Sequence, residues 1–85
     1  MPVKLLYFAW MREKIGRAEE ILDLPASVGT VADLIVWLRQ RGPEYEAALS
    51  RPGVIRAAID KRHVQPASAL AGAREIALFP PVTGG

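Results

Sequence analysis

Cysteine is absent from this chain of 85 residues, and histidine occurs only once, as His63. Without cysteine the chain can form no disulfide, no thiolate metal site and no cysteine nucleophile of its own. A single histidine cannot build a site of several histidines. We therefore expect no metal, no bound cofactor and no catalysis by the chain alone, and any sulfur chemistry would use sulfur from elsewhere.

The sequence also lacks a long hydrophobic run and a cluster of charges of one sign. The longest apolar run, residues 5–11, is far shorter than the roughly 20 residues of a membrane span. Charged residues 12–14 follow it, where a signal peptide would have small residues. The net charge is +2, and the basic residues are interleaved with Asp and Glu. We expect a cytoplasmic protein that binds neither a membrane nor nucleic acid.

The length and composition predict one small folded domain, since 85 residues are too few for two cores and 51% of them are hydrophobic. Strands are expected over residues 3–10 and 18–24, which would form a hairpin, and over 54–59. After a turn at Asp60-Lys61-Arg62, residues 63–64 would form a short return strand. Residues 75–79 alternate as a last strand, which the following prolines end.

The clearest helix begins after Thr30, because Thr30 and Asp33 have the spacing of a capping box. Gly42-Pro43 would stop this helix, and residues 44–49 could form a short second one. The order of elements is that of an α+β β-grasp fold, with a mixed sheet of about five strands and one main helix on one face. The expected core comprises Val3, Leu5, Tyr7, Ile21, Leu34, Ile35, Leu38, Val54, Ile59, Ile76 and Leu78.

The end of the chain follows the domain, residues 1–79, as an extended tail, residues 80–85. Pro80 and Pro81 lack N–H groups and fix φ, so the chain would leave the last strand as a stiff rod reaching roughly 20 Å. Gly84 and Gly85 have no Cβ atoms, which would let a narrow channel close around their backbone. A terminal Gly-Gly alone is weak evidence, because loose ends are often rich in small residues.

The terminal carboxylate could still carry chemistry, with the Thr83 hydroxyl to orient it. Adenylation by a separate enzyme that uses ATP would convert the carboxylate into a mixed anhydride. Attack by a sulfur nucleophile would then leave a thiocarboxylate, which could pass its sulfur to an activated carbon.

Three segments resemble the small-subunit family of molybdopterin synthase, whose members are sulfur carriers with a ubiquitin-like fold. They are the ending, residues 75–85, the opening, residues 3–9 with Arg12-Glu13 and Gly16, and the helix start, residues 30–34. The resemblance implies that Gly85 is adenylated by an E1-like enzyme, MoeB, and converted to a thiocarboxylate. It further implies that the tail enters the large subunit, MoaE, in a heterotetramer that builds the dithiolene of molybdopterin from cyclic pyranopterin monophosphate.

The same resemblance implies a partner-facing surface at the tail, formed by Phe8, Phe79, Pro80, Pro81, Val82, Thr83 and Gly84. The alternation of side chains agrees for the two aromatics, because Phe8 is out of phase with Leu5 and Tyr7, and Phe79 is out of phase with Ile76 and Leu78.

Some residues depart from the family pattern. Ile59-Asp60 and Gly72-Ala73 stand where the family often has Val-Asn and Gly-Asp, and His63 replaces a common apolar contact residue. We interpret His63 as a turn or rim residue. Three alternatives remain open: a sulfur carrier for thiamine thiazole synthesis, a ubiquitin-like modifier of lysines, and a passive interaction domain with an incidental tail.

Overall fold

The computed structural model describes residues 2–81. Val82, Thr83, Gly84 and Gly85, which carry most of the predicted tail chemistry, lie outside the described residues. The elements in chain order are β1 (Pro2–Tyr7), α1 (Ala9–Ile15), β2 (Glu19–Asp23), α2 (Val31–Arg39), α3 (Pro43–Ala48), a 3-10 helix (Pro52–Val54), β3 (Arg56–Ile59), β4 (Arg62–Val64) and β5 (Glu75–Phe79).

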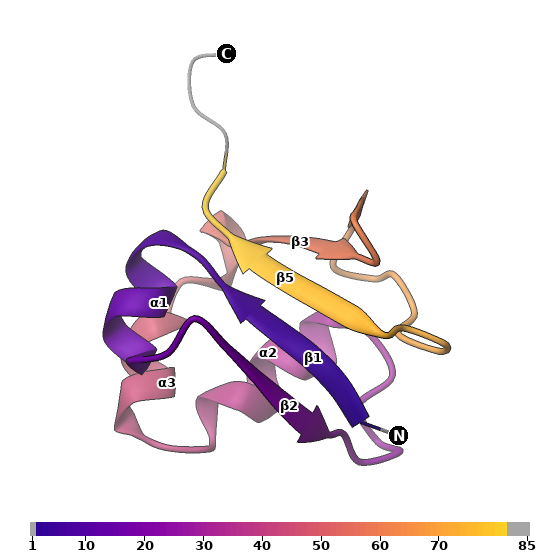
Figure 1. The fold of residues 1–85 in the computed structure, drawn as a ribbon, viewed down its shortest axis with the longest axis horizontal. Coiled ribbons are helices and arrows are strands. Elements are labelled where there is room, and N and C mark those ends of the chain that lie inside the picture. The colour runs from indigo at the N-terminus through magenta and orange to yellow at the C-terminus, as the bar shows by residue number, and fades with distance from the viewer. Residues whose placement is uncertain (1, 82–85) are drawn as a thin grey trace.

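The five strands form one mixed sheet in the order β2-β1-β5-β3-β4 (Figure 1). Strand β1 pairs with β5 in parallel, and the other neighbours are antiparallel. This is the predicted ubiquitin-like β-grasp arrangement, with the first and last strands side by side in the middle of the sheet. Because β1 and β5 run in the same direction, the residues that follow them emerge at the same edge.

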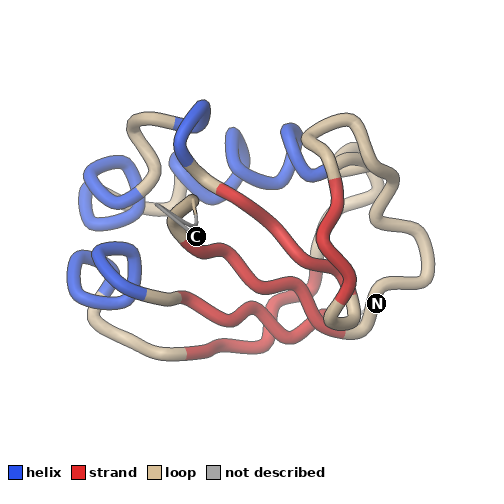
Figure 2. The backbone as a smooth tube through the Cα atoms, turned by 90° about the horizontal axis from the view of Figure 1, so that it is seen from above, coloured by secondary structure: helices blue, strands red, loops and turns tan. Residues whose placement is uncertain are grey.

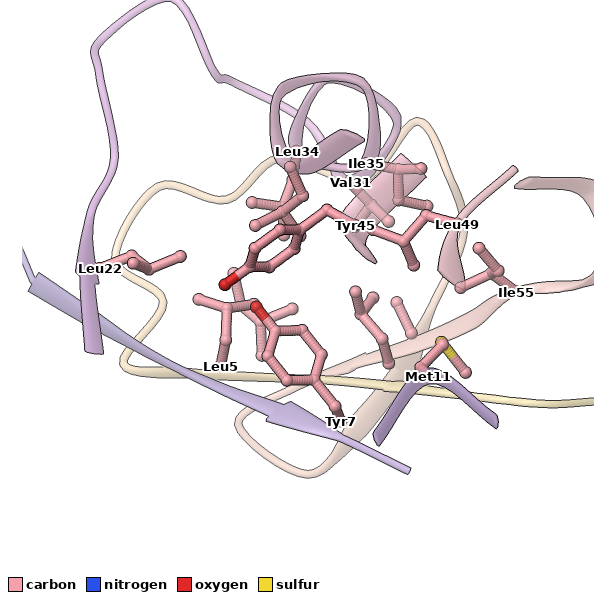
Figure 3. Close-up of a cluster of buried hydrophobic side chains, with 14 of the residues drawn as sticks. Leu5, Tyr7, Met11, Leu22, Val31, Leu34, Ile35, Tyr45, Leu49 and Ile55 are labelled. Atoms are coloured by element: carbon pink, nitrogen blue, oxygen red, sulfur yellow. The ribbon is translucent and has the colours of Figure 1, made fainter. Parts of the chain in front are cut away.

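One face of the sheet packs against the helices (Figure 2). Strand β1 alternates strictly, with Val3, Leu5 and Tyr7 buried and the residues between them more exposed. On the helical side the buried stripe of α2 covers this face, and α3 adds two side chains, as Figure 3 shows in part. These core residues are Val31, Leu34, Ile35 and Leu38 in α2, Tyr45 and Ala48 in α3, and Leu49 directly after α3.

The start of α2 confirms the predicted capping box. The Thr30 hydroxyl accepts from the Asp33 amide, and the Asp33 carboxylate accepts from the Thr30 amide, both at 3.2 Å. The predicted end was wrong in detail, because α2 ends at Arg39. Gly42-Pro43 instead opens α3, where Pro43 occupies a first-turn position that needs no N–H donor.

The prediction of a strand over residues 3–10 was wrong at its end, because the strand stops at Tyr7 and α1 follows. Phe8 is extended and Ala9 has φ 52, which turns the chain out of the sheet. Met11 and Ile15 are four residues apart and both buried, so they share the inner face of α1. A short apolar run does not distinguish strand from helix, so α1 was missed. The short second helix expected over residues 44–49 is present as α3.

Two predicted core residues are on the surface. Ile21 is 70% exposed and Val54 is 37% exposed, while Ile59 is partly buried. In β2 the residue that faces the core is Leu22, because it pairs with Val3, whereas Ile21 pairs with Lys4 on the opposite face. Val54 belongs to the 3-10 helix, so the strand predicted over residues 54–59 begins only at Arg56.

The turn between β3 and β4 forms where it was predicted. Asp60 and Lys61 have φ values of 48 and 73, a pair of left-handed residues that suits a tight hairpin. The Asp60 carboxylate also accepts from the amides of Arg74 and Glu75, at 3.1 and 2.9 Å. Asp60 therefore joins this hairpin to the start of β5.

Candidate functional site

The candidate site is the edge of the sheet where β1 and β5 end together. Phe79 is the last residue of β5, and Pro80 and Pro81 follow it outside any helix or strand, both half-buried. Neither proline has an N–H to continue the pairing, so the chain leaves the sheet here. Figure 1 shows this exit at the end of the β5 arrow.

Phe8 lies next to this exit. Tyr7 pairs with Leu78 in the parallel register, and the Phe8 amide donates to the Leu78 carbonyl at 3.1 Å. Phe8 and Phe79 are therefore the residues that come directly after a cross-strand pair, Tyr7 and Leu78, on adjacent strands. The Phe8 side chain is 45% exposed, so an apolar ring stands in solvent beside the point where the chain leaves the sheet.

Phe79 is half-buried, and His63 packs against it. The two ring centroids are 5.1 Å apart, and the planes are tilted by 59°. His63 lies in the exposed edge strand β4, so it is a rim residue, yet it also contacts a predicted anchor. The sequence offered no direct signal for this contact, which depends on how β4 and β5 both pair with β3.

The face of the sheet opposite the helices carries apolar side chains and forms a surface that leads to the exit. We call it the open face. No helix among the described residues covers it in Figure 2. Lys4 and Glu19 form an ion pair of 3.1 Å on it. Its apolar members, set by strand register, are Leu6, Ile21, Ala58, Ala77 and Phe79.

Sequence reasoning missed much of this open face because it placed Ile21 in the core. The pattern Ile21-Leu22 contains two adjacent apolar residues in a strand, and only one of them can face inward. Two adjacent apolar residues in a strand therefore indicate that one of them lies on an apolar outer face. Of the predicted site residues, the structure brings together Phe8, Phe79, Pro80 and Pro81.

A second polar cluster lies between the sheet and α3, around Glu20. The Tyr7 and Tyr45 hydroxyls both donate to one Glu20 carboxylate oxygen at 2.7 Å, and Arg17 contacts the other at 3.0 Å. Figure 3 shows the two phenol rings within the buried cluster. The Arg41 guanidinium lies 3.6 Å from Glu20 and 5.2 Å from the centre of the Tyr45 ring.

The Glu20 side chain is only 6% exposed. Its burial by itself would raise the pKa of Glu20, but the hydrogen bonds from Tyr45 and Tyr7 and the two arginine charges lower that pKa below the usual value. Burial and the bond to Glu20 raise the pKa of the Tyr7 phenol well above its normal range. The hydrogen bonds of Tyr7 and Tyr45 to Glu20 join β1, α3 and β2. Because these polar groups are all paired, the cluster offers no free acid or base.

Among residues 2–81, no group of three or more His, Cys, Asp or Glu side chains gathers in a way that could hold a metal ion. In the same part of the chain, no helix has the length and apolar character needed to cross a membrane.

Comparison with known proteins gives concordant results. Residues 5–85 match the ThiS family. The chain is 35% identical over 83 residues to a protein of Haemophilus influenzae named molybdopterin synthase sulfur carrier subunit, and the match covers 98% of this chain and 99% of that protein.

Solved structures agree with the fold. A putative molybdopterin converting factor, subunit 1, from Pyrococcus furiosus superposes with a TM-score of 0.72 and 28% identity, covering 96% of this chain and 99% of the other. SAMP1 from Haloferax volcanii superposes with a TM-score of 0.74 and 26% identity, with both chains fully covered.

Proposed function

This chain belongs to the ThiS family, and from that membership we propose that it is the sulfur carrier subunit of a molybdopterin synthase. The observation that carries the proposal is its similarity, along nearly the whole of both chains, to the Haemophilus influenzae subunit of that name. The Gly84-Gly85 ending and the absence of cysteine support it, because the carrier group would be the terminal carboxylate.

The chemistry takes place on Gly85. The carboxylate oxygen attacks the α-phosphorus of ATP, pyrophosphate leaves, and an acyl adenylate forms. Hydrosulfide then attacks the acyl carbon and AMP leaves, which gives the thiocarboxylate directly. The thiocarboxylate sulfur attacks an activated carbon of cyclic pyranopterin monophosphate and displaces the leaving group on that carbon. Water then cleaves the acyl C–S bond of the resulting thioester, which restores the carboxylate and leaves the sulfur on the pterin.

The rest of the chain would present that end to its partners. ATP binds to the adenylating enzyme, of the MoeB type, and the carrier then docks on a large subunit of the MoaE type in a heterotetramer. Phe8 and Phe79 support a docking role because they flank the exit of the chain at one edge of the sheet. The paired prolines favour a stiff stalk, residues 80–83, that would carry Gly84 and the reactive Gly85 at its end.

Intact mass spectrometry tests the proposal. We expect the chain, after incubation with ATP, the cognate adenylating enzyme and a sulfur source, to gain the mass of one oxygen-to-sulfur exchange at its C-terminus. Deletion of Gly85 should abolish both the mass gain and molybdopterin synthesis. Gly53→Ala is the matched control, because Gly53 lies in the 3-10 helix with open space around its Cβ position. Synthesis that survives the deletion would exclude this mechanism.

The same samples separate the alternatives. A carrier for thiamine thiazole synthesis would show the same mass gain but would support no molybdopterin synthesis with a large subunit. A ubiquitin-like modifier would appear in cell extracts as ladders of heavier conjugates. A passive interaction domain would show no dependence on Gly85 in any of these measurements.

A further inference from the structure

A groove with a volume of about 730 Å³ runs between α2 and the start of β3. We call it the α2–β3 groove. Its floor is made of side chains that also belong to the core, among them Ile35, Ile55 and Ala57, each at most 5% exposed. At its rim, Val36 is 54% exposed and Val64 is half-buried. The apolar surface that the groove exposes therefore lies mainly at its rim, above a floor of buried apolar side chains.

The charged side chains that line the groove, Arg39 and Arg56, are both basic. The single histidine, His63, lies beside them, and no carboxylate among residues 2–81 lines the groove. The Arg39 guanidinium already binds Glu46 through two contacts of 2.8 Å. Arg56 donates to the Gly53 carbonyl at 3.2 Å and, within residues 2–81, forms no ion pair. Arg56 thus offers a guanidinium with free donors at the edge of an apolar groove.

We propose that the α2–β3 groove binds a short peptide segment of a partner protein, in which apolar side chains fill the floor and a flanking carboxylate pairs with Arg56. A peptide fits better than a small compact ligand, because the apolar surface continues from the α2–β3 groove onto the exposed side chain of Val36. An acidic peptide fits better than a basic one, because a lysine or arginine would meet only like charges along the lining.

The groove also adjoins the surface beside the exit. His63 lines the groove and stacks on Phe79, and Arg56 pairs with Phe79 across the strands. A partner that covers Phe79 could therefore extend one segment past His63 into the groove. Peptide binding in the groove needs no sulfur transfer, so a negative result in the peptide test and a negative result in the mass test on Gly85 are independent of each other.

The test uses the full chain labelled with nitrogen-15 and two synthetic peptides. Both peptides have the same short apolar centre, flanked by glutamates in one and by lysines in the other. We expect the glutamate peptide to shift the amide signals of Val36, Ile55 and Val64, and to bind about tenfold or more tightly than the lysine peptide, as one good charge pair at a desolvated rim allows.

Substitutions make the test specific to the groove. Arg56→Glu should reverse the order of the affinities of the two peptides, and Arg56→Gln should abolish the difference between these affinities. Val36→Asp should weaken binding of the glutamate peptide, because it places a like charge on the rim. Ile21→Asp is the matched control: it changes an exposed apolar residue on the open face, where Ile21 is even more exposed than Val36, and should leave binding unchanged. Equal binding of both peptides, no binding, or shifts confined to the open face would overturn the proposal.

Discussion

The ring of His63 lies 5.1 Å from the ring of Phe79, across the strand that separates them. On one side of β3, His63 of β4 pairs with Ala58 of β3. On the other side, Phe79 of β5 pairs with Arg56, which lies two residues before Ala58 on the same face of β3. The small side chain of Ala58 leaves room for the two rings to meet above β3. The contact links the edge strand β4 to the residue from which the chain leaves the sheet.

We expect this ring contact to contribute about 0.5–1.5 kcal/mol, the range found for paired aromatic side chains. A double-mutant cycle with His63→Ala and Phe79→Ala, measured by urea unfolding, gives the coupling energy between the two rings. Phe8→Ala paired with His63→Ala is the control, since the ring contacts within residues 2–81 do not include this pair and the two effects should add. Additive effects for His63 and Phe79 would show that the stacking contributes nothing.

The Glu20 cluster predicts a loss of stability in acid. The pKa of Glu20 is lowered in the folded state from the ordinary 4.5, so the unfolded chain binds the proton first as the pH falls. The stabilisation is complete above pH 4.5 and is lost as the pH falls from there through the folded-state pKa. The free energy of unfolding, measured by urea titration across this range, should therefore decrease towards lower pH.

Glu20→Gln should remove that part of the pH dependence and lower the stability at neutral pH by about 1–3 kcal/mol, because the charged acceptor for two tyrosine hydroxyls is lost. Glu19→Gln is the matched control. Glu19 is adjacent in sequence, but its side chain is 55% exposed in a surface ion pair with Lys4, so its effect should be small. An equal effect of the two substitutions would contradict the role assigned to Glu20.

The capping box gives a prediction about α2. Thr30→Ala removes the hydroxyl that accepts from the Asp33 amide and should cost about 1 kcal/mol of stability. Thr30→Ser keeps an equivalent hydroxyl and should cost much less. Thermal unfolding of the two variants measures the difference, and an equally stable Thr30→Ala would show that the cap contributes little.

Gly16 ends α1 with φ 88, and its amide donates to the Arg12 carbonyl at 2.9 Å. Gly16→Ala should destabilise the protein by about 1 kcal/mol, because a Cβ is disfavoured in the left-handed region. Steric crowding is not the reason, since no atom lies within 4 Å of the Cβ position. Gly53→Ala has equally open surroundings without the positive φ. In chemical unfolding it should be neutral or slightly stabilising, and equal losses in both variants would refute the strain argument.

Much of the site could be anticipated, because the sequence shows where the last strand ends and which residues follow it. The out-of-phase positions of Phe8 and Phe79 pointed away from the core, and the structure leaves the first exposed and the second half-buried. Their part in partner binding stays a prediction, as does the chemistry of Gly85. The contact between His63 and Phe79 could not be read from the sequence, because sixteen positions separate them and two strand registers bring them together.

The sequence by itself determined the features that depend on residues close along the chain. The hydroxyl and carboxylate of Thr30 and Asp33 specify the start of α2, and the alternation of residues 75–79 specifies β5, because both signals act within one helical turn or one strand. Only the tertiary structure decided that the apolar run of residues 5–11 divides at Tyr7 and that Leu22 rather than Ile21 faces inward. Those choices depend on which remote surface each side chain can pack against, and a local pattern contains no information about that surface.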